Sequence, residues 1–248
     1  MKQKDFAKKR IMHIYIIIFI VILLILSAAT LMLKYSIEGE TNLPFNLNKF
    51  DVISTAESKL IQDEKGVWHA QILQKNDVYF QIEKNSKYKK EETIKKISFE
   101  NFEMKKENEN ININIYRPEI SMEKYNYTDE YKINDSLEFT GGLNTNAETL
   151  QINNQGGMIG FSIITNNIGE YIFSENEKLP SDGTLLAKAG AKAEDIKFEI
   201  SFDLVIETNS QNKFKSRITL NLPTGNILEE GVGRLEETEL KNVIFKRF

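Results

Sequence analysis

The chain of 248 residues contains no cysteine. Disulfide bonds, thiolate metal sites, iron–sulfur clusters and cysteine nucleophiles are therefore excluded, and so is a lipidated cysteine beside a membrane. A domain outside the cell would have to stay folded through its hydrophobic core alone. The chain is 41% hydrophobic and 27% charged, which is typical of a folded protein and not of a disordered one.

Histidine is almost as scarce, since only His13 and His69 occur. His13 lies in an apolar run and is interpreted as an interfacial residue, not as a proton relay. His69 alone cannot form a histidine-rich zinc site, and neither HExxH nor the GxSxG serine elbow is present. The sequence therefore predicts a non-enzyme with no catalytic, cofactor-binding or metal-binding residues, and with no cofactor.

Charge is distributed unevenly along the chain. Residues 1–34 contain one acidic residue, Asp5, and six basic residues: Lys2, Lys4, Lys8, Lys9, Arg10 and Lys34. The remaining residues, 35–248, contain 26 basic and 35 acidic residues, a net charge of −9. A domain of that sign repels nucleic-acid phosphates and anionic lipid headgroups. Nucleic acid is therefore not expected as a partner.

Residues 11–33 form a run of 23 residues without a formal charge. As a helix the run would be about 35 Å long, enough to cross a hydrocarbon core of about 30 Å. Five of the basic residues precede it and only Lys34 directly follows it. The positive-inside rule then predicts a cytoplasmic tail at 1–10, a transmembrane helix at 11–33, and a single-pass protein of the cell membrane with its C-terminal domain outside.

The alternative interpretation of this run is a cleaved export signal. Ser27-Ala28-Ala29 has the small-residue pattern that a signal peptidase accepts, and the apolar run before it has a suitable length. The run resumes at residues 31–33, however, which a cleaved signal does not need. An uncut anchor is therefore favoured, and cleavage stays open.

After a polar linker at 34–46, the sequence has the pattern of strands. Alternation places Phe198, Ile200, Phe202, Leu204 and Ile206 on one face of residues 197–207. It likewise places Phe214, Ile218, Leu220 and Leu222 on one face of residues 213–223. Two alternating stretches on either side of a short polar turn predict an antiparallel hairpin.

Further stretches of strand length lie at 66–72, 77–84, 94–104, 148–165 and 242–248, and only 183–196 has a helical composition. The prediction is an all-β fold, with the transmembrane helix followed by an extracytoplasmic antiparallel β-sandwich at 47–248. A polar stretch near 117–136 leaves open a division into two packed β lobes.

Several residues stand out as candidates. Trp68, the only tryptophan, has apolar neighbours at period two and is expected in the core, not on a ligand-stacking surface. His69 should then face the opposite side, towards solvent. Asp203, next to Phe202, should likewise face solvent, so that its exchange for asparagine would be nearly neutral.

Some short patterns resemble functional motifs but lack the rest of them. Ser-x-x-Lys occurs at Ser86/Lys89, Ser121/Lys124 and Ser210/Lys213, without the Ser-Asp-Asn and Lys-Thr-Gly of penicillin-binding enzymes. The LPTG at 222–225 lacks the spacing of a sorting signal and is expected to end a strand. The acids Asp129, Glu130 and Asp135 lack calcium-loop spacing. The basic segment 83–96 is interpreted as a solvated loop and short helix, not as a contact to anionic lipid or wall polymer.

Four stretches together resemble an uncharacterised family of single-pass, membrane-anchored extracytoplasmic proteins of low-GC Gram-positive bacteria: LPFNLNKFDVISTAES at 43–58, NDVYFQIEKN at 76–85, NQGG at 154–157 and IKFEISFDLVIET at 196–208. The resemblance implies a location and transfers no activity or site residue. The predicted function is a non-catalytic binding or assembly partner in the cell envelope, with another envelope protein or a wall polymer as partner. The alternative is an extracytoplasmic hydrolase that uses Asp and Glu carboxylates the sequence cannot place.

Overall fold

The computed structural model describes residues 2–120, 124–144, 148–174, 177–180, 183–240 and 243–248, with side chains from residue 12 onward. The chain divides into two compact units, residues 1–41 and 42–248, and each is described here by itself. The first unit is one helix, α1 (Lys2–Glu38). From Met12 onward this helix is long and apolar enough to cross a membrane.

The helix continues past the apolar run to Glu38. Lys34 and Glu38 form an exposed i,i+4 ion pair of 3.7 Å, and the amide of Gly39 donates to the carbonyl of Tyr35 at 2.9 Å. Gly39 has a φ of 71°, the left-handed conformation that commonly ends helices. The first strand begins at Phe45, so the connection is shorter than the linker predicted at 34–46, because polar residues complete the last helical turn.

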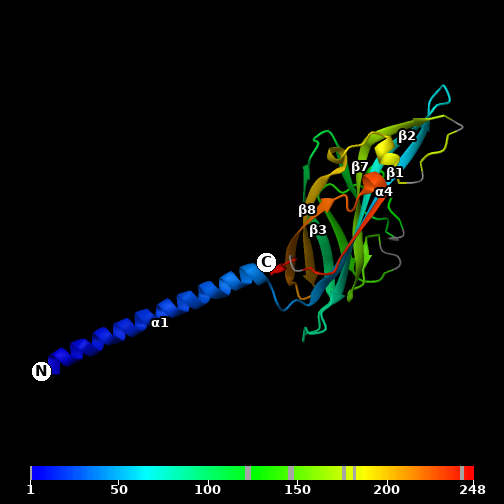
Figure 1. The fold of residues 1–248 in the computed structure, drawn as a ribbon. Coiled ribbons are helices and arrows are strands. Elements are labelled where there is room, and N and C mark those ends of the chain that lie inside the picture. The colour runs from blue at the N-terminus through cyan, green and yellow to red at the C-terminus, as the bar shows by residue number, and fades with distance from the viewer. Residues whose placement is uncertain (1, 121–123, 145–147, 175–176, 181–182, 241–242) are drawn as a thin grey trace. The chain divides into compact units, whose positions relative to one another are not determined.

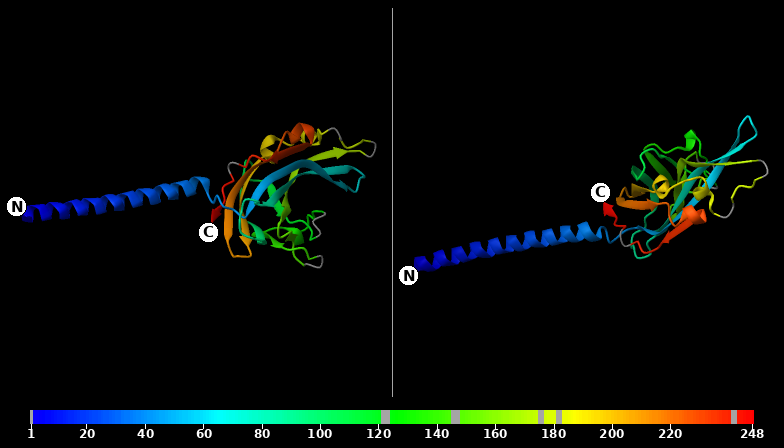
Figure 2. Two further views of the ribbon diagram at one scale, coloured as in Figure 1. Left: turned by 90° about the horizontal axis from the view of Figure 1, so that it is seen from below. Right: turned by 45° about the horizontal axis from the view of Figure 1, so that its top comes forward.

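The second unit is a β-sandwich of two sheets that face each other (Figures 1 and 2). Sheet A contains, in spatial order, β10 (Val232–Glu237), β1 (Phe45–Gln62), β2 (Trp68–Lys84), β7 (Gly156–Phe173) and β4 (Asn112–Tyr116). Sheet B contains β11 (Lys246–Arg247), β9 (Lys213–Leu222), β8 (Phe198–Thr208), β3 (Ile94–Lys106), β5 (Ser136–Gly141) and β6 (Gln151–Ile152). Neighbouring strands are antiparallel except β5 and β6, which are parallel.

Phenylalanine rings from both sheets form the centre of the sandwich. The ring centroid of Phe80 in sheet A lies 5.1 Å from that of Phe99 and 5.7 Å from that of Phe202, both in sheet B. Phe161 of sheet A lies 5.3 Å from Phe202, edge to face. All four rings are fully buried. The period-two faces predicted for 197–207 and 213–223 are confirmed, because every residue assigned to them is buried.

A second, smaller core lies where β1, β2 and β7 extend past sheet B. Three short helices pack there: α2 (Leu185–Lys188), α3 (Ala193–Ile196) and α4 (Ile227–Glu230). Their buried side chains, among them Leu186, Ile196 and Ile227, meet Ile72 and Phe173 of the sheet. The helical composition of 183–196 is thus confirmed as two short helices. They are separated near Gly190, which has a φ of 77°.

The polar stretch near 117–136 does not separate two lobes, because residues 42–248 form one compact unit. The described part of this stretch folds back beside β4. The amide of Arg117 donates to the backbone carbonyl of Tyr131 at 2.9 Å, and the amide of Ile133 donates to the backbone carbonyl of Ile115 at 2.8 Å. Its one regular element is a three-residue 3₁₀ turn at Asp129–Tyr131. Its polarity reflects its position on the surface of one domain.

Candidate binding surfaces

The β1–β2 hairpin ends in a segment whose outer edge has no partner strand. Strand β10 pairs with β1 only as far as Thr55, and the amide of Ala56 then donates to the carbonyl of Gly231 at 2.9 Å. Residues 57–62 continue for six positions with β2 on one side and, in the part of the chain that the structure describes, no strand on the other. The turn of this hairpin projects beyond sheet B (Figures 1 and 2). We call residues 57–62, 68–72 and 169–173 the hairpin end.

Apolar side chains are exposed at the hairpin end. Leu60 is 50% exposed, Ile61 40% and Ile172 55%. Ile61 lies opposite His69, and His69 lies opposite Ile172, so these three side chains share the outer face of sheet A. An open strand edge with apolar side chains favours pairing with another chain, and proteins usually cover or charge such edges.

The opposite face of the hairpin end carries an aromatic row. The ring of Phe173 stacks on Trp68 at 6.5 Å and on Tyr171 at 6.1 Å between centroids, each with an interplanar angle of 18°. Trp68 is half-buried and packs against the second core. Its assignment to the core is therefore confirmed, although at the margin of that core and not at its centre.

The turn between the two strands is held by a side chain. One carboxylate oxygen of Asp63 accepts from the amides of Lys65 at 2.9 Å and Val67 at 2.8 Å. The hydrogen bond from Val67 is the main reason that the pKa of Asp63 is lowered. His69 faces the side opposite to Trp68, as predicted, but it is not simply solvated: its Nδ1 lies 3.1 Å from a Glu170 oxygen and its Nε2 lies 3.7 Å from Asp63.

Paired carboxylates occur on the outer face of sheet A, around Lys75. Its Nζ lies 2.7 Å from a Glu57 oxygen and 3.6 Å from an Asp77 oxygen. Burial opposes the charge of Lys75, but the hydrogen bond to Glu57 and the charge of Asp77 outweigh burial and raise its pKa. Burial raises the pKa of Asp77, whose side chain is only 13% exposed. Both acids therefore pair with the same ammonium group, whose charged form they favour.

A tyrosine, Tyr125, packs beside this group on the same face of sheet A. The rings of Tyr125 and Tyr79 lie 6.4 Å apart, and burial raises the pKa of Tyr125. Gly160 lies beneath: a Cβ there would be 3.3 Å from the Tyr125 hydroxyl and 2.3 Å from the Val78 carbonyl. The close approach of Tyr125 thus depends on a residue without a side chain. Asp77 itself is mostly enclosed, since its side chain is only 13% exposed.

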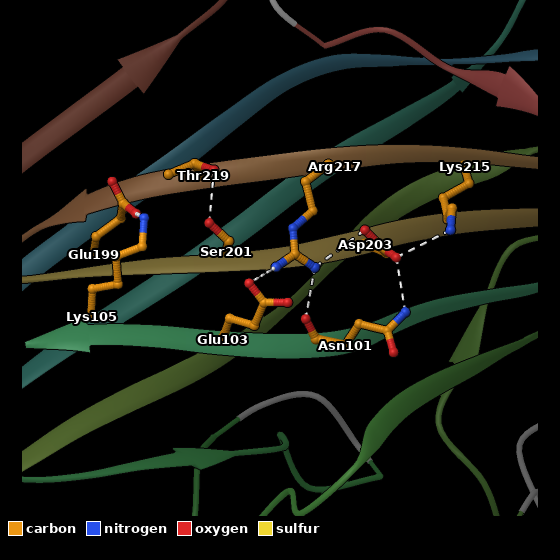
Figure 3. Close-up of polar contacts among 9 residues, drawn as sticks. All are labelled: Asn101, Glu103, Lys105, Glu199, Ser201, Asp203, Lys215, Arg217 and Thr219. Carbon is orange, nitrogen blue, oxygen red and sulfur yellow. Dashed lines mark hydrogen bonds and ion pairs between the residues drawn. The ribbon is translucent and has the colours of Figure 1, made fainter.

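The outer face of sheet B is a network of ion pairs across β3, β8 and β9 (Figure 3). Asp203 on the central strand accepts from Asn101 at 2.8 Å and from Arg217 at 3.3 Å, and lies 3.3 Å from the Nζ of Lys215. Farther along β8, Glu199 pairs with Lys105 at 2.6 Å. Acids on the middle strand are thus neutralised by basic residues of both neighbours.

The prediction that Asp203 is merely solvated is wrong. Its side chain points away from the core, as the alternation requires, but the residue is only 7% exposed. The long side chains of Arg217 and Lys215 lie over it, because their aliphatic parts can cover a sheet surface while their charged ends bind the carboxylate. Burial tends to raise the pKa of Asp203, but the hydrogen bond from Asn101 and the nearby positive charges outweigh burial and lower it.

Asp203→Asn is therefore expected to destabilise the protein by about 1–2 kcal/mol at neutral pH, because hydrogen bonds to charged groups are lost. A carboxylate with a folded pKa below its unfolded value of about 3.9 stabilises the protein above that value. This stabilisation is lost as the pH falls through the folded pKa. Urea unfolding from pH 7 to pH 3 should therefore show a smaller loss of stability on acidification for the variant than for the wild type.

Glu103→Gln is the matched control, because Glu103 also pairs with Arg217, at 2.8 Å, but is 72% exposed. Exposed pairs of this kind contribute little, so the control should unfold within about 0.5 kcal/mol of the wild type. Equal effects of the two substitutions would contradict the buried role of Asp203.

The LPTG segment at 222–225 ends β9, as predicted, and it also joins the two sheets. The Thr224 amide donates to Ser54 Oγ at 2.9 Å, and the two hydroxyl oxygens lie 3.0 Å apart. Both residues are buried. The opposing strand approaches closely, since a Cβ on Gly233 would lie 1.8 Å from the Thr224 carbonyl oxygen. The segment is a structural connection and not an exposed signal.

The remaining candidates are dispersed. Ser86 and Lys89 lie in the exposed turn after β2, and Ser210 and Lys213 lie at the tip of the β8–β9 hairpin. The short helix expected within 83–96 is absent from this fully described segment. Ser121 lies outside the described residues. Each of the three acids of the weak calcium candidate is exposed: Asp129, Glu130 and Asp135.

Among the residues that the structure describes, no group of three His, Cys, Asp or Glu side chains could hold a metal ion. Comparison of the chain with protein-family models, with curated proteins and with solved structures finds no match. The family resemblance drawn from the sequence stays a prediction, and function has to be argued from the surfaces themselves.

Proposed function

We propose that this protein is a non-catalytic, membrane-anchored protein of the cell envelope that binds another envelope protein through the hairpin end. The observation that carries the proposal is the open edge of residues 57–62 beside the exposed side chains of Leu60, Ile61 and Ile172. Since the Ala56 amide points towards β10, alternation directs the backbone groups of residues 58, 60 and 62 to the open edge. These groups fit strand addition by a partner, with apolar side chains adding contact area.

The location proposed for this activity is the outer side of the cell membrane. The apolar helix from Met12 supports membrane anchoring, and the five basic residues ahead of residue 11 support a cytoplasmic N-terminus. The family resemblance leads to the same location. An uncut anchor then keeps the β-sandwich attached to the membrane.

The length of β1 supports a role in reaching a partner. The strand has 18 residues, so at about 3.3 Å per residue its far end lies about 55 Å from Phe45, where the chain enters the domain. The hairpin end is thus at the opposite end of the β-domain from its point of attachment. A partner can therefore reach the hairpin end without approaching the end of the domain that is attached to α1.

The alternative function, a hydrolase with two acids, finds its best arrangement at Glu57 and Asp77. Glycoside hydrolysis needs one carboxyl group able to donate a proton and a second free to act as a base or nucleophile. Here Lys75 binds both acids, and Tyr125 lies over the same face. This arrangement supports a structural role for the pair and favours the binding protein over the hydrolase.

Photo-crosslinking in intact cells tests the proposal. A photoreactive amino acid at Ile61 of the full-length chain should give a discrete adduct of higher mass, whereas the same residue at the exposed Thr219, on the ion-paired face of sheet B, should not. Proline lacks a backbone N–H, so Leu60→Pro removes a donor that faces the open edge and none that faces β2. It should therefore abolish the Ile61 adduct. Identical adduct patterns at the two positions, or an Ile61 adduct that persists in Leu60→Pro, would contradict strand addition at this edge.

A further inference from the structure

Segments far apart in the sequence meet at the end of the β-domain where the chain enters it. The amide of Asn85 donates to the carbonyl of Pro44 at 2.9 Å, and its side chain donates to Leu43 at 2.8 Å. The turn after β2 is therefore tied to the entering chain. In Figure 1 this turn, the β8–β9 turn and the C-terminus lie together, at the opposite end of the domain from the β1–β2 turn.

Further hydrogen bonds join the other segments to this end. The amide of Asn209, in the β8–β9 turn, donates to Thr93 at 3.0 Å. Strand β11 pairs with β9, placing Arg247 opposite Phe214, and the Arg247 side chain donates to that of Asn212. The segments 84–93, 209–214 and 246–247 therefore form one surface.

This surface, which we call the basic end, carries seven exposed basic residues: Lys84, Lys87, Lys89, Lys90, Lys213, Lys246 and Arg247. Of these, Lys213 lies 3.7 Å from a Glu207 oxygen. The exposed acids in the same segments and beside Lys84 are Glu83 and Glu91. Glu92 and Glu207 also lie here, but both are buried, and Glu207 is bound to Lys95 at 2.6 Å. The charge that reaches solvent at the basic end is therefore strongly positive.

The net charge of −9 over residues 35–248 does not cancel this local charge at a distance. In physiological salt, interactions between exposed charges are largely screened once the charges are more than about 8 Å apart. A planar anionic surface that touches the basic end interacts most strongly with the charges nearest to it, and acids more than about 8 Å from that surface contribute little. Local charge, and not the total, decides attraction there.

The linker between α1 and the β-domain is short. Leu43, to which Asn85 is bound, follows the last helical residue, Glu38, by five positions. Five extended residues span at most about 18 Å. If α1 crosses the membrane, as proposed above, the basic end cannot move far from the lipid headgroups. An exposed apolar residue, Leu143, is also near: it is 80% exposed and follows β5, whose Gly141 lies against the Ile94 carbonyl.

We infer that the basic end rests on anionic phospholipid headgroups of the leaflet from which α1 emerges. This inference rests on the membrane anchoring proposed above and adds a second contact with the same membrane. Juxtamembrane clusters of lysine and arginine bind anionic lipid through many weak attractions, not through one pocket. Seating the domain in this way would orient the long β1–β2 hairpin away from the bilayer.

Full-length protein reconstituted into vesicles tests the inference. Because the chain has no cysteine, Ser86→Cys provides a single site in the exposed turn for a fluorophore. Lipids with a nitroxide on the headgroup should quench this fluorophore in vesicles of phosphatidylcholine and phosphatidylglycerol. Quenching should be much weaker in phosphatidylcholine alone, and should weaken as the salt concentration rises to about 1 M.

Two charge variants in the Ser86→Cys background separate the basic end from charge in general. The first variant combines Lys87→Gln, Lys89→Gln and Lys90→Gln. It should lower the ratio of protein whose basic end contacts the lipid to protein whose basic end does not by on the order of 100-fold, at about fivefold per lysine near an anionic surface. The matched control changes three exposed lysines away from this end, Lys59→Gln, Lys65→Gln and Lys132→Gln. It should retain the quenching of the parent.

The other outcomes overturn the inference. Equal quenching in the two lipid mixtures, or equal loss in the two triple variants, would show that the basic end has no specific role. Displacement by inorganic phosphate at constant ionic strength would indicate a site for a single anion and not a lipid surface. Flotation with the vesicles reports anchoring separately: flotation without lipid-dependent quenching overturns the seating alone, whereas failure to float overturns the anchoring as well.

Discussion

Phe202→Ala is expected to lower the free energy of unfolding by about 3–5 kcal/mol, the usual cost of truncating a buried phenylalanine. Phe202 is fully buried, and its ring is in contact distance of Phe80, Phe99, Phe102 and Phe161, with centroids 5.3 to 5.7 Å away. The rings belong to both sheets, so the cavity would lie at the centre of the sandwich. Net stabilities are on the order of 5–15 kcal/mol, and the chain has no disulfide to compensate.

Urea unfolding of the detergent-solubilised full-length protein, followed by circular dichroism of the β-structure, measures this loss. Phe248→Ala is the control, because it removes the same side chain from a position that is 63% exposed. It should stay within about 0.5 kcal/mol of the wild type. Wild-type stability for Phe202→Ala would show that the two sheets do not pack around this ring.

Gly233→Ala is expected to cost about 3 kcal/mol, at the upper end of what overpacking usually costs. The added Cβ would lie 1.8 Å from the carbonyl oxygen of Thr224, a backbone atom that cannot rotate away. Relief requires the turn at 223–225 to move. That movement would break the buried hydrogen bonds between Thr224 and Ser54, which hold the turn against sheet A.

Gly157→Ala serves as the control, because the nearest neighbours of its Cβ would be the Ile152 side chain at 3.4 Å and the Asn153 nitrogen at 4.0 Å, both ordinary contacts. Its backbone is also free of the left-handed conformation that would strain an alanine. The same unfolding measurement should show little change for Gly157→Ala. Similar stabilities for the two variants would mean that β10 does not lie as close to the turn as the structure places it.

The local elements could be predicted from the sequence because their causes are local. Alternating side chains point to opposite sides of a strand, so the positions from Phe198 to Ile206 and from Phe214 to Leu222 define a buried face without further information. The apolar run at 11–33 likewise reports a membrane-compatible helix through its length. The linker is a few residues shorter than the sequence predicts, because the end of the helix depends on the conformation of Gly39 and not on hydrophobicity.

The sequence by itself therefore determined the N-terminal apolar helix, the strand periodicity and the all-β class. Tertiary structure decided which charges are buried and which lie together. Asp203 looks solvated in its own strand, yet residues of β3 and β9 cover it. Net charge predicted repulsion from anionic lipid, yet folding brings lysines and an arginine from three distant segments to the end of the domain beside the linker. Electrostatic attraction and burial depend on distances in space, which strand pairing fixes and the linear order of residues does not.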